Sequence, residues 1–259
     1  MKFGKWSGLG NDFIFPEPGE RVSPAAVPRL CDRRNGIGGD GVILISPRGG
    51  NDFEMKIFNA DGSEAAMCGN ATRCAAKYIL SRNLGKGTVF HLHTLSGIVS
   101  PELLADGRVR VDMGAPREFL GDIALAAAGR RFEAVTVSMG NPHAVIFTGN
   151  VSAVPLETWG PILEHDPQFP DRCNIEFAQI LDAGRIRMRV WERGCGITSA
   201  CGTGSCATLA AAQKKNLCGD EADIILDGGV LHIEHKAGQS VFMTGPALEI
   251  FTGEIENEQ

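Results

Sequence analysis

One cysteine of this chain stands where it could act as a reactive thiol. Cys201 precedes a Gly-Thr-Gly turn and then a run of small helix formers, residues 206–213, so we expect it at the start of a helix. There the positive end of the helix dipole favours the thiolate and lowers the thiol pKa from its free value of about 8.5. The peptide N–H groups of the first turn have no partner within the helix and can bind an anion such as a carboxylate.

The same arrangement occurs once earlier in the chain. Cys68 precedes a Gly-Asn pair and a helical run over residues 71–80, and Cys201 follows Cys68 by 133 residues. Further anchors recur at that spacing or at 130 residues: Phe58 with Trp191, Gly69 with Gly202, Asn11 with Asn141, and Met113 with Met243. Chance could repeat one Cys-Gly pair, but several anchors in one order predict an internal duplication. We therefore expect two similar halves, each with one cysteine at a helix start.

Length, charge and composition limit the class of protein. The 259 residues suit two domains of about 130 residues each or one larger domain. Net charge is −6 without a long basic run, so a small molecule is expected as partner rather than nucleic acid. The first residues lack a signal peptide, and no apolar run approaches the roughly 20 residues that span a bilayer. We expect a cytoplasmic protein that does not enter a membrane, whose eight cysteines are thiols rather than a disulfide framework.

The pattern of apolar residues and turn signals predicts an α+β fold with much strand and one main helix per half. Residues 1–15 are expected to form a hairpin, 23–32 a short helix capped by Ser23, and 88–113 a three-stranded meander. The cysteine helices are expected to run to residue 82 and over 204–215, and Pro161 to interrupt a helix within 154–165. Glycine and proline mark residues 114–121 as a boundary. The predicted halves are residues 1–115 and 116–246, with residues 247–259 returning to the first half.

Two other motifs could bind a cofactor or a metal ion. Residues 36–41 match G-x-G-x-x-G, but a dinucleotide site needs a strand before and a helix after, whereas here the strand VILIS follows. We prefer to interpret these residues as a glycine turn that leads into a strand, at a position that could line a site. Cys68 with Cys74, and Cys201 with Cys206, could ligate zinc; the second cysteine of each pair is better explained as a small apolar residue inside a helix.

Three further residues are candidate site residues because of their position in the sequence. His143 lies two residues after Asn141, in the turn that repeats the turn at Asn11. Glu192 and Arg193 end a predicted strand shortly before Cys201. Beside a reactive thiol they could bind a zwitterion, with Arg193 on a carboxylate and Glu192 on an ammonium group.

These residues lie in sequence words that resemble those of the diaminopimelate epimerase family, pyridoxal-independent amino-acid racemases, along nearly the whole chain. The words are GLGNDFIF, NGIGGDG, FNADGSEAAMCGNATRC, VDMGAP, SMGNPHAV, CNIEF and WERGCGITSACGTGSC. The resemblance implies two pseudo-symmetric halves, each a mostly antiparallel mixed sheet wrapped around a central helix, with the active site in the cleft between them.

The resemblance also implies a role for individual positions. Cys68 and Cys201 would be the acid–base thiols, and His143 and Glu192 would set their charge states. The other positions would bind substrate: Gly69, Asn70, Gly202 and Thr203 at the reacting carboxylate, Arg193 at the distal carboxylate, and Asn11, Asn59, Asn141, Asn174 and Glu192 around the rest.

The implied reaction is the conversion of LL-2,6-diaminopimelate to the meso form, a step of lysine and peptidoglycan precursor biosynthesis. It would need no pyridoxal cofactor and no metal. A homodimer is the expected assembly. Two alternatives stay open: a racemase of another amino acid, as in the proline racemase branch, and a zinc-binding or thiol-redox module.

Overall fold

The chain divides into two compact units. The computed structural model describes residues 1–256, so the last three residues of the predicted 247–259 segment lie outside the described residues. Unit 1 combines Met1–Val111 with Gly245–Gln259, and unit 2 is the continuous stretch Asp112–Thr244.

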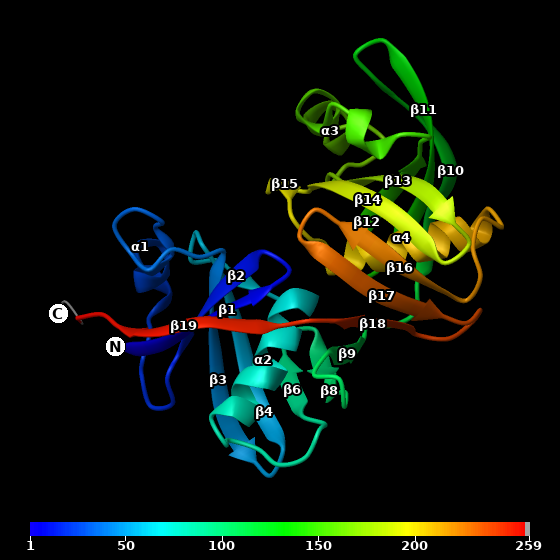
Figure 1. Cartoon of the computed structure of the whole chain (residues 1–259). Helices are drawn as coiled ribbons and strands as arrows, with labels where there is room; N and C mark the ends of the chain where they lie inside the picture. Colours follow the sequence, from blue (N-terminus) through cyan, green and yellow to red (C-terminus); the bar gives the residue numbers. More distant parts are fainter. Residues whose placement is uncertain (257–259) are drawn as a thin grey trace. The chain divides into compact units, whose positions relative to one another are not determined.

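Unit 1 is a sheet with one long helix and one short helical segment (Figure 1). Its elements are β1 (Lys2–Gly8), β2 (Asn11–Pro16), η1 (Pro24–Ala26), α1 (Val27–Cys31), β3 (Gly41–Gly49), β4 (Asp52–Asn59), β5 (Glu64–Ala65), α2 (Gly69–Ser81), β6 (His91–Thr94), β7 (Gly97–Val99), β8 (Glu102–Leu103), β9 (Val109–Asp112) and β19 (Leu248–Glu254). The strand order of the sheet is β19-β1-β2-β3-β4-β6-β7, with β5 paired to β4.

Unit 2 follows the same plan. Its elements are β10 (Arg117–Ala127), β11 (Arg130–Ser138), β12 (Pro142–Phe147), η2 (Val151–Ala153), α3 (Leu156–Glu164), β13 (Asn174–Asp182), β14 (Arg185–Glu192), β15 (Gly196–Thr198), α4 (Gly202–Lys214), β16 (Glu221–Leu226), β17 (Gly229–His235) and β18 (Val241–Gly245). Among the strands of this unit, the order is β10-β11-β12-β13-β14-β16-β17-β18, with β15 paired to β14.

The two sheets repeat each other pairing by pairing. In unit 1, β19/β1, β1/β2, β3/β4 and β6/β7 are antiparallel, whereas β2/β3 and β4/β6 are parallel. In unit 2, β10/β11, β11/β12, β13/β14 and β16/β17 are antiparallel, whereas β12/β13 and β14/β16 are parallel. The short strands β5 and β15 each pair antiparallel with the strand that precedes them. The predicted α+β fold with two pseudo-symmetric halves is confirmed.

Each long helix is almost entirely buried against its own sheet (Figure 1). In α2 the buried residues include Ala71, Ala75 and Ala76, and in α4 they include Ala207 and Ala211. Alanine is a strong helix former, and its small side chain lets sheet strands approach the helix closely on several sides. A helix buried on nearly all sides is a fixed support, so the residue at its start is held in a fixed position.

The structure corrects three expectations about local structure. Residues 88–113 do not form one meander: β6 pairs with β7 and β8 with β9, and within the described residues no ladder joins β7 to β8. Within the expected boundary 114–121, residues 117–121 belong to the long strand β10, whose register shifts between Glu118 and Asp122. Helix α3 continues through Pro161 instead of breaking there. A bulge and a helical proline explain why turn residues misled the sequence interpretation.

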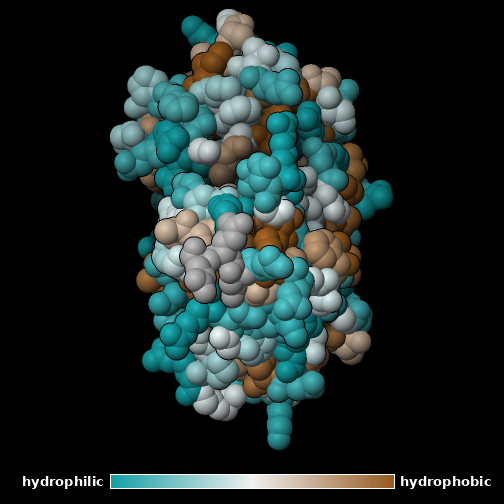
Figure 2. Space-filling view, turned by 90° about the vertical axis from the view of Figure 1, so that its left-hand side faces the viewer, coloured by the Kyte–Doolittle hydropathy of each residue, from teal (hydrophilic) through white to brown (hydrophobic). Residues whose placement is uncertain are grey.

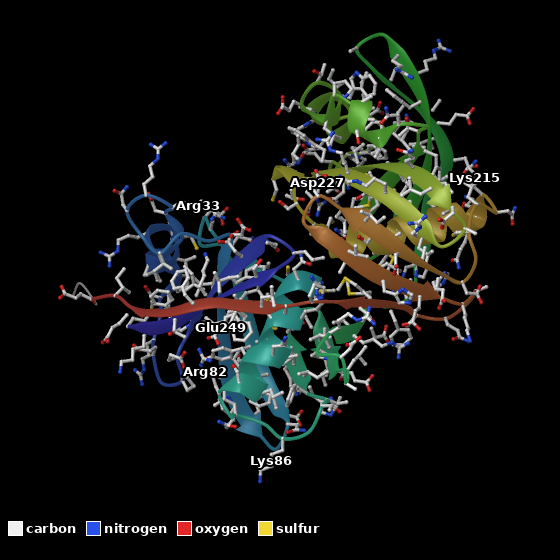
Figure 3. All side chains as sticks on the ribbon, viewed as in Figure 1. Arg33, Arg82, Lys86, Lys215, Asp227 and Glu249 are labelled. Carbon is white, nitrogen blue, oxygen red and sulfur yellow. The ribbon has the colours of Figure 1, made fainter. Side chains whose placement is uncertain are left out.

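The C-terminal strand is fastened to the long helix of unit 1. Arg82, which caps the C-terminus of α2, forms ion pairs with Glu17 at 2.7 Å and with Glu249 of β19 at 2.5 Å (Figure 3). Tyr78, one turn earlier in α2, is 1% exposed and donates a hydrogen bond from its hydroxyl to the carbonyl oxygen of Pro16 at 2.8 Å. These contacts join α2 to the ends of β2 and β19.

Removing the Tyr78 hydroxyl should cost stability without changing packing. In Tyr78→Phe the buried carbonyl of Pro16 loses its donor, so we expect the free energy of unfolding to fall by about 1–2 kcal/mol. Urea unfolding followed by circular dichroism measures this change. A midpoint and slope equal to those of the wild type would mean that this hydrogen bond contributes nothing net.

The surface is mostly polar on the face that Figure 2 shows, with hydrophobic residues in small separate groups. No helix among residues 1–256 is long and apolar enough to cross a membrane.

Candidate active site

In unit 2, the sulfur of Cys201 caps the N-terminus of α4. Cys201 has an extended backbone, and its sulfur accepts a hydrogen bond from the backbone N–H of Gly204 at 3.3 Å. The sulfur also lies 3.6 Å from the hydroxyl oxygen of Thr203. The residue is 3% exposed. A thiol in this position satisfies one of the unpaired N–H groups at the helix start, as a serine or aspartate cap does elsewhere.

Burial reverses the expected pKa shift of Cys201. Desolvation raises the pKa of this thiol well above its ordinary value, and the carboxylates of Glu192 and Glu176 raise it further. The hydrogen bonds from Gly204 and Thr203 oppose this rise without cancelling it. The prediction of a lowered pKa for Cys201 was therefore wrong, because the helix start lies inside the unit rather than at its surface.

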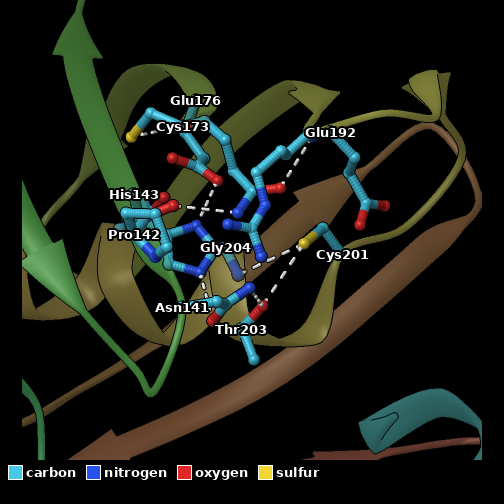
Figure 4. Close-up of polar contacts among 12 residues, drawn as sticks. Asn141, Pro142, His143, Cys173, Glu176, Glu192, Cys201, Thr203 and Gly204 are labelled. Carbon is cyan, nitrogen blue, oxygen red and sulfur yellow. Dashed lines mark hydrogen bonds and ion pairs between the residues drawn. The ribbon is translucent and has the colours of Figure 1, made fainter. Parts of the chain in front are cut away.

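A chain of buried and half-buried polar groups leads to Cys201 (Figure 4). The ring of His143 bonds through Nδ1 to Oε1 of Glu176 at 2.7 Å and through Nε2 to Oδ1 of Asn141 at 3.0 Å, and neither side chain of the His143–Glu176 pair is exposed. The amide nitrogen of Asn141 then donates to the hydroxyl of Thr203 at 3.4 Å. Each ring nitrogen of His143 therefore faces a side-chain oxygen atom. The hydroxyl of Thr203 accepts from Asn141 and can donate its own proton to the sulfur of Cys201.

Glu192 lies on the other side of Cys201, at the end of β14. Burial raises the pKa of its carboxyl group above the ordinary value, against hydrogen bonds from Thr198 and Cys201 that lower it. The carboxylate of Glu192 thus disfavours ionisation of Cys201, whereas the hydrogen bond from Cys201 favours ionisation of Glu192. Such pairs are common where a side chain must gain and lose a proton.

Arg193 and Asn174 are joined in the same unit. The side-chain oxygen of Asn174 accepts from the backbone N–H of Arg193 at 2.9 Å, and its amide nitrogen donates to the carbonyl of Pro142 at 2.9 Å. The guanidinium of Arg193 donates one hydrogen bond to the carbonyl of Asp171 at 3.1 Å. Asn174 therefore connects the turn of Arg193 to the strand of His143.

In unit 1, Cys68 holds the corresponding N-cap position before α2. Its sulfur lies 3.9 Å from the side-chain oxygen of Asn11, which also accepts from the amide of Asn70 at 3.2 Å. The amide nitrogen of Asn11 donates to the carboxylate of Asp40 at 2.7 Å. Asn59 bonds instead to Ser63 in its own turn, at 3.0 Å.

The two repeats differ in the polar side chains that lie next to their cysteines. Asn11 turns its oxygen toward Cys68, whereas Asn141 turns its nitrogen toward Thr203. In the parallel ladders of the two units, His143 pairs with Asn174 as Phe13 pairs with Gly41. His143 and Glu176 of unit 2 therefore correspond to Phe13 and Ile43 of unit 1, which are both buried. The polar chain to Cys201 is a property of one repeat.

Sequence reasoning missed two carboxylates of these networks. Glu176 stands inside the apolar strand word CNIEF, where a buried charge signals a partner, and Asp40 ends the glycine turn NGIGGDG. The four residues predicted at the helix starts lie there. Gly69 and Gly202 are the first residues of α2 and α4, and Asn70 and Thr203 are the second.

The second cysteine of each proposed zinc pair is buried in its helix. Cys74 and Cys206 are 0% exposed. Burial raises the pKa of Cys74 to about 12. Zinc binds cysteine as the thiolate, whereas a neutral, enclosed thiol acts as a small apolar group in the packing of its helix.

The model of one protein family, described as diaminopimelate epimerase, matches residues 3–118 and 135–249. The chain belongs to the diaminopimelate epimerase family. The match covers the hairpin of Asn11, both cysteine helices and the turn of Glu192 and Arg193. The family predicted from the sequence words is confirmed.

Named relatives match over their whole length. The chain is 45% identical over 276 residues to the diaminopimelate epimerase of Synechocystis sp., covering 99% of both chains. It is 46% identical over 275 residues to the diaminopimelate epimerase of Pelotomaculum thermopropionicum, covering 98% of both. The chain is thus similar to diaminopimelate epimerases from end to end.

Solved structures with distant sequences share the fold. A probable proline racemase from Agrobacterium radiobacter has a TM-score of 0.73 at 17% identity and covers 99% of this chain and 93% of its own. A hydroxyproline epimerase from Agrobacterium vitis has a TM-score of 0.72 at 17% identity, with 98% and 91% covered. At such identities the likeness concerns the fold alone.

Proposed function

We propose that this chain epimerises LL-2,6-diaminopimelate to meso-diaminopimelate without a cofactor, a step of lysine and peptidoglycan precursor biosynthesis. The observation that carries the proposal is the duplicated cysteine: Cys68 and Cys201 each cap a buried central helix, in two units with the same topology. Inversion of a carbon atom needs a base on one face and an acid on the other, and one thiol from each repeat supplies that pair. Whole-length similarity to diaminopimelate epimerases supports this substrate.

In the proposed reaction, one sulfur atom takes a proton from the substrate and the other gives one to it. The thiolate of Cys68 takes the α-proton, the electron pair of the broken C–H bond delocalises into the carboxylate, and the thiol of Cys201 donates its proton to the opposite face. After one turnover, Cys68 is the thiol and Cys201 the thiolate. The raised pKa of Cys201 supports the thiol as its form before the reaction. The polar chain through Asn141 and Thr203 supports the thiolate that it becomes.

Helix starts would stabilise the charge that develops on the substrate. The N–H groups at Gly69, Asn70, Gly202 and Thr203 are assigned to the reacting carboxylate, where the positive ends of α2 and α4 favour negative charge. Arg193 is assigned to the distal carboxylate and Glu192 to an ammonium group. The asparagines Asn11, Asn59, Asn141 and Asn174 complete the proposed set of substrate contacts.

The decisive experiment is incubation of the purified chain with LL-diaminopimelate in D₂O, with a reductant and without added cofactor. We expect meso product on chiral chromatography and one deuterium at the inverted carbon. A parallel panel of L-proline, L-glutamate and L-lysine distinguishes a racemase of another amino acid. Exchange of proline in preference to diaminopimelate, or no exchange of diaminopimelate at all, would reject this proposal.

A further inference from the structure

The turn that carries Glu192 and Arg193 has an anchor outside the proposed substrate contacts. The turn follows β14, and its residues Glu192 and Arg193 are only partly buried, while Gly194 and Cys195 are exposed. A partly exposed turn does not fix the direction of a long arginine side chain by itself. The packing that holds the turn comes from α3, the helix that precedes β13.

Glu164, the last residue of α3, binds the turn on both sides. Its carboxylate oxygen Oε2 accepts a hydrogen bond from the indole N–H of Trp191 at 2.7 Å, and Oε1 accepts from the backbone N–H of Gly194 at 2.9 Å. The guanidinium of Arg172 pairs with Oε1 at 3.3 Å. Trp191 and Gly194 directly flank Glu192 and Arg193. Glu164 is only 3% exposed, so its carboxylate oxygens bind these donors instead of water.

The indole ring fits closely against α3. A Cβ atom placed on Gly160 would lie 2.4 Å from the ring of Trp191, so the helix reaches the ring only because residue 160 has no side chain. The backbone carbonyl of Glu164 also accepts from the N–H of Cys173 at 3.2 Å. Glu164 therefore holds both the turn and residues 171–174, which provide the two hydrogen-bond partners of Arg193 described above.

We propose that Glu164 is a positioning residue for recognition of the distal carboxylate of the substrate, acting through the turn that carries Arg193. This inference rests on the proposed function, because it takes Arg193 as the contact to that carboxylate. Glu164 itself touches no reacting atom. It uses one buried carboxylate to hold the residues on each side of Arg193, so the guanidinium meets the substrate already oriented.

The first test is Glu164→Gln, which keeps the volume but replaces one acceptor oxygen with an NH₂ group. One of the two N–H donors of the turn then loses its acceptor, so the turn moves. We expect KM for LL-diaminopimelate to rise about tenfold while kcat stays within about threefold, the pattern of lost binding rather than lost chemistry. Glu157→Gln, at an exposed position in the first turn of α3, is the matched control and should leave both constants unchanged.

The second test asks whether the effect passes through Arg193. If it does, Glu164→Gln should add almost nothing to Arg193→Leu, because groups that act as one unit are not additive. Trp191→Phe removes one donor and should raise KM in the same direction by a smaller factor. If Glu164→Gln does not fold, Trp191→Phe replaces it in this test.

Three results would overturn the inference: equal KM values in Glu164→Gln and Glu157→Gln, a fall in kcat with KM unchanged, or fully additive effects of Glu164→Gln and Arg193→Leu. Failure of the proposed function gives a different result, since the wild-type chain would then not turn over diaminopimelate at all.

Discussion

Replacement of either Cys68 or Cys201 by alanine is expected to reduce epimerisation of diaminopimelate by at least about a thousandfold, within the range that general acid–base groups contribute. Each variant keeps one thiol, so it lacks either the base or the acid of every turnover. The fold should persist, because each cysteine begins a helix whose stability comes from its buried alanines rather than from the cap.

A single remaining thiol still permits a diagnostic half of the reaction. It can remove an α-proton and return a deuteron on its own face, so each variant should exchange one stereoisomer in D₂O without inverting it. Cys218→Ala, which changes a partly buried cysteine after α4, serves as the control and should remain active. Near-normal epimerisation by Cys68→Ala or Cys201→Ala, in protein with a normal melting temperature, would refute the two-thiol scheme.

Gly204→Ala is expected to reduce kcat by about a hundredfold or more, as loss of a single preorganised donor does in other enzymes. A Cβ atom at residue 204 would lie 2.7 Å from Oε1 of Glu176 and 3.1 Å from the sulfur of Cys201. Both atoms are buried and cannot swing into solvent, so one must move. The N–H of residue 204 then no longer points at the sulfur, or the carboxylate leaves His143.

The matched control for this substitution is Gly219→Ala. A Cβ atom at Gly219 would meet no atom within 4 Å, so this variant changes the same residue type in the same unit without a clash. Steady-state kinetics of both variants, together with thermal unfolding, separates loss of catalysis from loss of fold. A kcat for Gly204→Ala within a few-fold of that for Gly219→Ala would show that the sulfur tolerates displacement.

The sequence was most informative where local chemistry determines structure. The order Cys-Gly followed by small residues predicted both central helices, and their starts differ from the observed ones by only two residues. The duplication followed from spacing alone, because equal spacing of glycines and cysteines reflects equal topology. The roles of the individual site residues stay predictions that the experiments above test.

Other features depended on tertiary contacts that no local pattern contains. The pKa of Cys201 shifts upward because the folded unit buries the thiol and brings the carboxylates of Glu192 and Glu176 close to it. Strand β10 was missed because its glycine and polar residues resemble a linker until the partner strand β11 is known. Glu164 gave no signal, since its donors Trp191 and Gly194 come more than 25 residues later.

The path of the chain through unit 1 bears on how the protein is made. The edge strand β19 of this sheet is synthesised only after all of Asp112–Thr244, whereas unit 2 is complete in one uninterrupted stretch. A nascent chain on the ribosome can therefore finish the second repeat while β1 of the first still exposes an open edge. Such edges attract other strands, so molecules whose translation stops before β19 should be the ones that chaperones and proteases must remove.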